Sequence, residues 1–338
     1  MSTLLLVLGN GLTMDLINKL QIDTKISTSN LFLNGDLVQW PDGSNEKGFL
    51  SYKYCRNLWN LGARPYMEHM DANELIEDII SCANMLPSDM KSNQENNIYM
   101  NAYYELVAYL KQLFVYYNNL VSDDLLQSNE IVNWGWYKLI KNAYSSSQYD
   151  KIIIVTYNYD VFLERILKVH NIPFDISLID EKDNKISILK PHGSISFAHK
   201  NKNEKASFEI RKSPVMYEAE INDFTTVYSD MDNNYSINAL IPPSGDSSRL
   251  TYKWAEEMRN KVKNKVQSIG DKDKVIISGL SYWHVDRREI DEVLANVNSN
   301  AKIYMVNPNP PRALNAVLSC VFDNYILYTD SDNLGGLL

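Results

Sequence analysis

The sequence of 338 residues predicts an α/β fold: a doubly wound, mostly parallel sheet with a helical insertion at about residues 40–147. Three observations predict it. Short continuous apolar runs are typical of strands that are buried on both faces. From Lys151 onward these runs alternate with stretches of helical periodicity, as in β-α-β units with right-handed crossovers. Glycine or polar turns follow the ends of the runs, which is where such sheets bind ligands.

The individual elements follow from this pattern in chain order. A short helix is expected to begin near Thr13, after the first strand, and a mostly helical block comes before the alternation at Lys151. Residues 199–250 give no clear pattern. The expected strands are 4–8, 152–155, 176–179, 186–189, 275–278, 303–306 and 325–328, and the expected helices are 71–86, 103–117, 130–144, 161–170, 252–266, 287–298 and 312–319.

Composition excludes several classes of protein. The net charge is −9 and most of the acidic excess falls in residues 1–150, which disfavours direct nucleic-acid binding. No apolar run approaches the roughly 18 residues of a membrane span, and residues 1–8 lack the basic flank of a signal peptide. Cys55, Cys82 and Cys320 show no paired spacing, so we expect neither disulfides nor a metal site. A cytoplasmic protein is therefore expected.

The first strand is followed by a glycine turn, Gly9-Asn10-Gly11, and then by Thr13. Glycine lets the backbone approach a pyrophosphate, and a helix N-terminus supplies N–H groups and the positive end of the helix dipole. Thr13 can cap that helix or bond a phosphate. Because position 14 is Met, the motif is not a full G-x-G-x-x-G, and it lacks the lysine of a P-loop. An ordinary tight strand–helix turn is the alternative.

Two further turns contain groups suited to chemistry. Asn158 and Asp160 straddle the end of the second long strand, where an amide and a carboxylate can grip ribose hydroxyls and a carboxamide. The alternative for Asp160 is a helix N-cap. His192 lies between Pro191 and Gly193, where it can act as a general base or hold a sugar hydroxyl. The alternative for this histidine is a structural role.

Two later strand ends add to the pattern. Gly279 and Ser281 form a second small-residue turn, with Asp286 five residues after the serine. Asn307 opens an Asn-Pro-Asn-Pro sequence, in which asparagine can contact a ribose or an adenine edge; a turn fixed by proline is the alternative. Since parallel strands place their carboxyl ends at one edge, we expect all these turns to lie close together.

In this order the motifs resemble the Rossmann-like fold of the sirtuin-like NAD-binding proteins, and within them the prokaryotic sirtuin-like NADases of anti-phage defence. Residues 9–13 resemble the glycine-rich phosphate turn, 156–160 the Thr-x-Asn-Tyr-Asp signature, 190–194 the Lys-Leu-His-Gly-Ser motif, 279–286 the Gly-Tyr-Ser…Asp turn, and 307–310 the Asn-Pro-x-Pro motif. Two departures stand out. Residues 193–280 contain no cysteine, whereas deacylating sirtuins have four zinc-binding cysteines there, and Asn10 replaces the usual alanine.

The resemblance implies an NAD+ hydrolase that releases nicotinamide and ADP-ribose and uses no metal. Asn158 and His192 are then catalytic: the amide positions a ribose hydroxyl or the attacking water, and the imidazole holds a sugar hydroxyl and takes its proton. The glycine turn and Thr13 hold the pyrophosphate, and Asp160 fixes the nicotinamide carboxamide. The residues implied to bind NAD+ are Gly9, Asn10, Gly11, Thr13, Asp15, Tyr157, Asp160, Gly279, Ser281, Asp286 and Asn307.

Two other functions stay open: an NAD-dependent deacylase or ADP-ribosyltransferase, and a non-catalytic sensor of NAD or ADP-ribose. An NADase that is always active would kill its cell, so we expect its activity to be gated. The chain ends soon after its last expected strand, and we expect no separate C-terminal domain. Gating is therefore expected through a homo-oligomer or through a partner such as a HerA-type DNA-translocase ATPase or an Argonaute-like protein. The helical insertion is the expected interface.

Overall fold

The computed structural model describes residues 2–22, 26–85, 97–210, 218–242, 252–282 and 287–337. Its centre is a seven-stranded sheet in the order β10-β9-β8-β1-β2-β4-β3, in which every strand pair is parallel. The strands are β1 (Ser2–Leu8), β2 (Tyr149–Thr156), β3 (Phe174–Ile176), β4 (Ile186–Leu189), β8 (Lys274–Ser278), β9 (Lys302–Val306) and β10 (Asn324–Tyr328).

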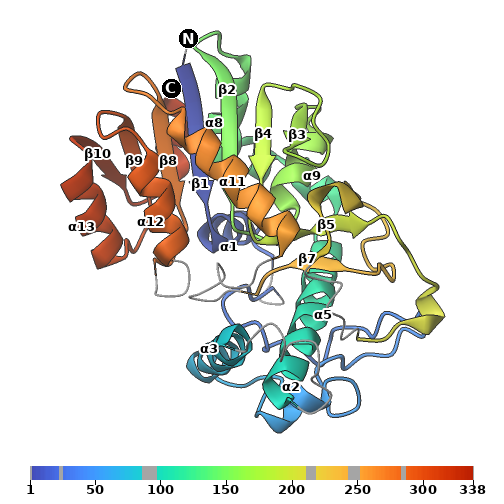
Figure 1. Ribbon diagram of the computed structural model, residues 1–338. Helices are drawn as coiled ribbons and strands as arrows, with labels where there is room; N and C mark the ends of the chain where they lie inside the picture. The colour runs from blue at the N-terminus through green and yellow to red at the C-terminus, as the bar shows by residue number, and fades with distance from the viewer. Residues whose placement is uncertain are drawn as a thin grey trace.

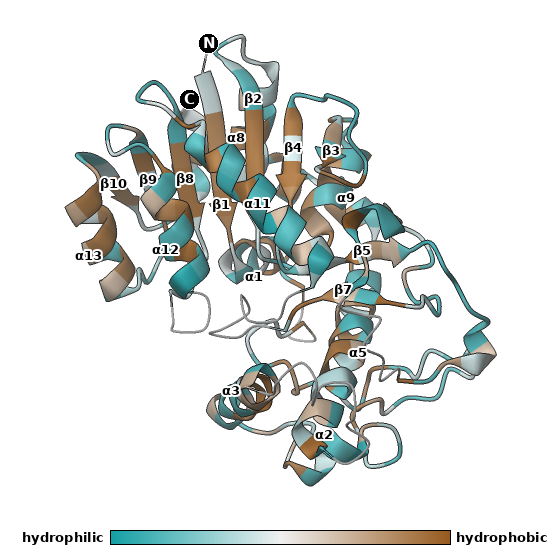
Figure 2. Cartoon of the chain, viewed as in Figure 1, coloured by the Kyte–Doolittle hydropathy of each residue, from teal (hydrophilic) through white to brown (hydrophobic). Residues whose placement is uncertain are grey.

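Helices cover both faces of this sheet, which confirms the doubly wound α/β fold (Figure 1). The helices that alternate with the strands are α1 (Asn10–Lys19), α9 (Phe162–Val169), α11 (Lys253–Gln267), α12 (Arg287–Asn296) and α13 (Arg312–Val321). The strands are apolar along most of their length, whereas the outward side of α11 is polar (Figure 2). Six of the seven expected strands and the helices after residue 150 are thus confirmed, with ends that differ by a few residues. The strand expected at 176–179 shares only Ile176 with β3, because the chain turns at residues 177–179.

A block of helices lies between α1 and β2 in the chain. Its members are α2 (Arg56–Asn60), α3 (His69–Met85), α5 (Ile98–Asn119), α6 (Asp123–Leu126), α7 (Asn129–Val132) and α8 (Gly135–Ser145). The expected single helix over residues 130–144 is two helices, because the chain turns at Asn133 and Trp134. The last of them, α8, packs against β2 on the face of the sheet opposite α11.

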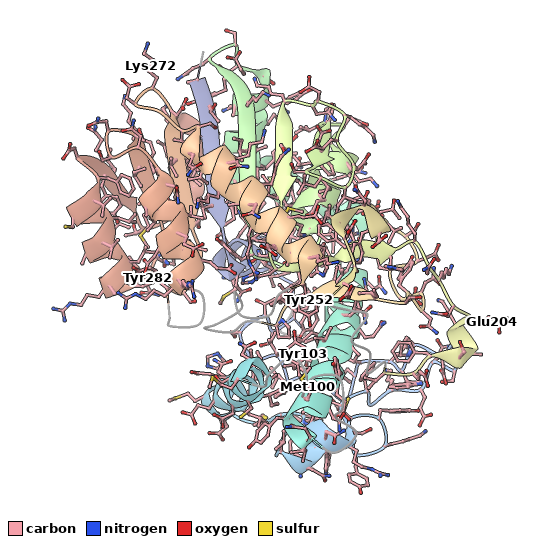
Figure 3. All side chains as sticks on the ribbon, in the orientation of Figure 1. Met100, Tyr103, Glu204, Tyr252, Lys272 and Tyr282 are labelled. Carbon is pink, nitrogen blue, oxygen red and sulfur yellow. The ribbon has the colours of Figure 1, made fainter. Side chains whose placement is uncertain are left out.

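Helix α5 is more buried than its sequence predicts. Periodicity indicates one apolar face, but α5 is buried on nearly every side, because α2, α3 and the second, smaller sheet pack around it. It runs from the lower part of the molecule, beside α2, up towards the main sheet (Figure 1). Near its start the hydroxyl of Tyr103 lies 2.9 Å from that of Tyr252, which precedes α11 (Figure 3).

The smaller sheet is antiparallel and has the order β6-β5-β7. It consists of β5 (Gly193–His199), β6 (Phe224–Thr226) and β7 (Asn238–Leu240), and two 3-10 turns lie nearby, η1 (Lys205–Ser207) and η2 (Ile221–Asp223). A third, η4 (Asp332–Gly336), packs against α8. No described helix combines the length and the apolar composition that a bilayer crossing needs.

Candidate functional site

The carboxyl ends of three central strands lie side by side. Leu8, the last residue of β1, pairs with Thr156 at the end of β2 and with Ser278 at the end of β8. The turns that follow these strands therefore start from one row, as the sequence predicts. They surround a cavity with about 620 Å³ of empty space, including its open mouth. Its lining residues are Gly9, Asn10, Thr28, Leu31, Phe114, Tyr157, Asn158, Tyr159, Asp160, His192, Gly279, Leu280 and Ser281.

Two glycine turns pack backbone against backbone at this cavity. Gly279 has φ +66°, in the region that favours glycine. A Cβ on Gly11 would lie 2.4 Å from the Cα of Gly279, and one on Gly9 would lie 2.6 Å from its carbonyl oxygen. The amides of Gly9 and Gly11 donate to Ser278 O (2.9 Å) and Gly279 O (3.2 Å). The glycines thus let the two turns meet, and these two amides are already engaged rather than directed at a pyrophosphate.

Thr13 has a different role from the one expected. Helix α1 begins at Asn10, so Thr13 lies within its first turns and does not cap it. Its side chain is buried, and its hydroxyl lies 2.7 Å from Oδ2 of Asp160 and 3.0 Å from Nδ2 of Asn158. A buried hydroxyl with two partners does not reach a phosphate in this conformation. Thr13 instead connects the two polar side chains of the second turn.

This connection fixes how the Asn158 amide is oriented. A carboxylate only accepts hydrogen bonds, so the Thr13 hydroxyl donates to Asp160 and its lone pair accepts from the amide NH2 of Asn158. The carbonyl oxygen Oδ1 of Asn158 is therefore the end of the amide that is turned away from Thr13. At the cavity wall, Asn158 is positioned to act as a hydrogen-bond acceptor.

Asp160 is buried beneath the cavity and is held from several sides. Besides Thr13, the amide of Phe162 donates to its Oδ1 over 3.2 Å, which ties Asp160 to the start of α9. Lys190 donates to its backbone carbonyl (2.5 Å) and pairs with Glu164 (2.7 Å). Burial raises the pKa of the Asp160 carboxyl, and the charge of Lys190 and the Thr13 hydrogen bond oppose that shift.

His192 lies in the turn between β4 and β5. The next residue, Gly193, has φ +83°, and a Cβ there would lie 1.8 Å from the carbonyl oxygen of Ala239 in β7. The unusual backbone expected beside the histidine is therefore confirmed. The imidazole ring lies edge-on to Tyr157, with ring centroids 5.0 Å apart. Its Nε2 lies 2.8 Å from Oε2 of Glu289 in α12, whose Oε1 accepts from Nε of Arg259 in α11 over 2.9 Å.

Part of the chain that forms this site is similar to a known protein family. A family model described as the SIR2-like domain matches residues 152–319. This match supports a sirtuin-like family. The range covers the turns at 156–160, 190–194 and 279–281, and β1 with its glycine turn lies outside it. A search of curated proteins finds no match. A SIR2-like domain binds NAD+ and generally implies an enzyme that uses it, and three of the turns that line the cavity fall within the matched range.

Besides Thr13, three residues expected to contact NAD+ do not line this cavity. Asp15 accepts from Trp134 Nε1 (2.8 Å) and from Ser331 Oγ (2.7 Å), so it connects α1 to other helices. The side chain of Asn307 accepts a hydrogen bond from the backbone amide of Asn309 within its own turn. This contact agrees with the alternative in which Asn307 belongs to a local turn. Gly11 touches Gly279 and not the cavity. Asp286 lies outside the described residues.

Other residues at the cavity have no motif to mark them. Leu31 and Phe114 form part of an apolar wall, and the ring of Phe114 packs edge-on to Tyr159 with centroids 5.2 Å apart. Thr28 adds its backbone carbonyl, which accepts from the side chain of Asn10 (3.2 Å). Periodicity places Phe114 on an apolar helix face but does not show what that face meets. Within the described ranges, no three His, Cys, Asp or Glu side chains are grouped closely enough to hold a metal ion.

Proposed function

We propose that this SIR2-like chain is an NAD+ glycohydrolase that breaks the nicotinamide–ribose bond and releases nicotinamide and ADP-ribose. One observation supports this above the others: the Asn158 amide and the His192 imidazole line the same cavity, beside the two glycine turns. A neutral acceptor, a base and a buried carboxylate in one small space suit the hydrolysis of a glycosidic bond.

Each group has a task in this reaction. The Asp160 carboxylate below the cavity accepts from the nicotinamide carboxamide and fixes the ring while the C–N bond breaks and positive charge develops on the ribose. Asn158 Oδ1 accepts a hydrogen bond from a ribose hydroxyl or from the attacking water. His192 takes the proton that this hydroxyl or water gives up. Leu31 and Phe114 keep bulk water from the reacting carbon. The N-terminal end of α1 favours the negative pyrophosphate.

The wider role that we propose is depletion of cellular NAD+ in anti-phage defence, by a cytoplasmic enzyme that a homo-oligomer or a protein partner gates. The motif resemblance supports this role. A HerA-type ATPase and an Argonaute-like protein are the partners to test first, and the helices between α1 and β2 are the surface to test for binding. Light scattering measures the mass of the purified particle, and an assay of the same sample measures its rate. A strict monomer that is fully active without a partner would contradict the proposed gating.

Nicotinamide release from NAD+ by the purified chain tests the proposed reaction. Asn158→Ala and His192→Ala should each lower the rate of nicotinamide release by on the order of 10²-fold or more. Their circular dichroism spectra should match that of the wild type, which shows that the fold is kept. His69→Ala is the matched control, because His69 is an exposed imidazole on α3 and should keep the wild-type rate. Wild-type turnover in both cavity variants would contradict the assignment. Acyl-lysine hydrolysis or label transfer to protein would point to the deacylase or transferase instead.

A further inference from the structure

A carboxylate and a guanidinium lie behind the candidate catalytic histidine. Glu289 is in the first turn of α12 and Arg259 is in the middle of α11, so three separate elements meet at the His192 ring. Glu289 is buried, with a side chain only 9% exposed, and the Arg259 side chain is 20% exposed. None of the sequence motifs includes either residue. The arrangement belongs to the fold rather than to any local pattern.

The arrangement keeps Glu289 ionised. A buried carboxylate is costly unless a charge and hydrogen bonds compensate it. Arg259 supplies the charge at Oε1 over 2.9 Å, and the position in the first turn of α12 places the carboxylate near the positive end of that helix. Charge-assisted hydrogen bonds of this length are the strong ones. Glu289 therefore faces His192 as an anion, which can accept hydrogen bonds but cannot donate them.

An accepting carboxylate determines which ring nitrogen of His192 bears hydrogen. Because Oε2 of Glu289 lies 2.8 Å from Nε2, the imidazole donates from Nε2, and in the neutral ring the lone pair is on Nδ1. When Nδ1 takes a proton from a ribose hydroxyl or a water, the Nε2 proton stays in place. The resulting imidazolium is then paired with the Glu289 anion.

We propose that Glu289, itself held by Arg259, is a positioning residue that fixes His192 in its Nε2–H form and stabilises the imidazolium formed during catalysis. This inference rests on the proposed glycohydrolase activity for its effect on rate. Its effect on the histidine ring itself does not depend on that activity.

A second cavity gives access to this carboxylate. It encloses about 640 Å³ of empty space between α11 and α12, including its mouth, and its lining includes Glu289, Arg259 and Glu292. Removing the Glu289 side chain opens a space beside a guanidinium and an imidazole, and this cavity connects it to the outside. A small carboxylate such as formate fits the vacated position chemically, since it supplies the acceptor and the charge that the variant lacks.

The experiment compares Glu289→Ala and Glu289→Gln with Glu292→Ala, which removes an exposed carboxylate from the same helix and cavity. We expect Glu289→Ala to lower kcat by on the order of 10²-fold with little change in KM for NAD+. Glu289→Gln keeps an acceptor but not the charge, so its kcat should be intermediate, and Glu292→Ala should behave as wild type. Formate should restore much of the kcat of Glu289→Ala and none of that of His192→Ala.

Histidine ring NMR provides the readout that is independent of activity. In a long-range ¹H–¹⁵N spectrum the wild-type His192 ring, assigned by its absence in His192→Ala, should show the Nε2–H form, and Glu289→Ala should lose that preference. A wild-type kcat in Glu289→Ala, or an unchanged ring form with no rescue by formate, would overturn the inference. If the wild-type chain cleaves no NAD+, the proposed function fails, and the ring form alone decides whether Glu289 positions His192.

Discussion

The contact between the two glycine turns allows a prediction in which strain and collision are separated. Gly279→Ala adds a Cβ at φ +66° that would lie 2.5 Å from backbone atoms of Gly11. The left-handed conformation costs an alanine about 1–2 kcal/mol. The collision adds about 1–3 kcal/mol, because backbone atoms cannot rotate away as a side chain does. We therefore expect Gly279→Ala to lower the free energy of unfolding by roughly 2–5 kcal/mol.

Two matched variants isolate the two causes. Gly43 has a similar φ of +87°, and nothing lies within 4 Å of a Cβ added there. Gly43→Ala should therefore lower the free energy of unfolding only by the strain, about 1–2 kcal/mol. Gly11→Ala has no left-handed strain but brings its Cβ to 2.4 Å from Gly279. Alanine gains about 1 kcal/mol of helix propensity, which offsets part of the collision. Urea unfolding measures all three, and calorimetry measures NAD+ binding, which the Gly11 and Gly279 variants should weaken. Equal losses in Gly279→Ala and Gly43→Ala would show that the turn contact contributes nothing.

Two further predictions concern buried lysines. Burial lowers the pKa of Lys111 from 10.5 to about 7, so the folded chain holds fewer protons than the unfolded chain between these values, and stability rises with pH across that window. Lys111→Met should lose this rise in the free energy of unfolding, which urea unfolding at pH 7 and pH 9 measures. A variant whose free energy of unfolding rises with pH as steeply as that of the wild type would contradict the prediction. Lys190→Met leaves the buried Glu164 without its ion-pair partner and should cost about 3–5 kcal/mol. Adding Glu164→Gln should recover much of that loss, and a double variant as unstable as the single one would show that the unpaired charge is not the cause.

The main sheet could be predicted because each of its strands is a local signal. Runs such as Leu4 to Leu8 are apolar because both faces of the strand are covered, and the turns after them mark where they end. The smaller sheet could not be predicted, because β6 and β7 are three residues long and depend on pairing with β5. For the same reason the burial of α5 on all sides follows from what surrounds it and not from its own periodicity.

The candidate site was likewise predictable only in part. Strand-end reasoning brings Asn158 and His192 to one cavity because the neighbouring strands β2 and β4, which they follow, end side by side at Thr156 and Leu189. Contacts between turns were not predictable: nothing in the sequence shows that the second glycine turn would occupy the amides of the first. Glu289 was also missed, since it lies 97 residues from His192 and has charged neighbours that are exposed to solvent.

The length of α5 places two parts of the molecule on one element. Its 22 residues form one rod of roughly 33 Å, with Phe114 against the cavity and its first turns beside α2 and α3. Because the rod is buried along most of its surface, the side chains packed around it determine where Phe114 lies. The shape of one cavity wall therefore depends on packing that lies well away from the cavity itself.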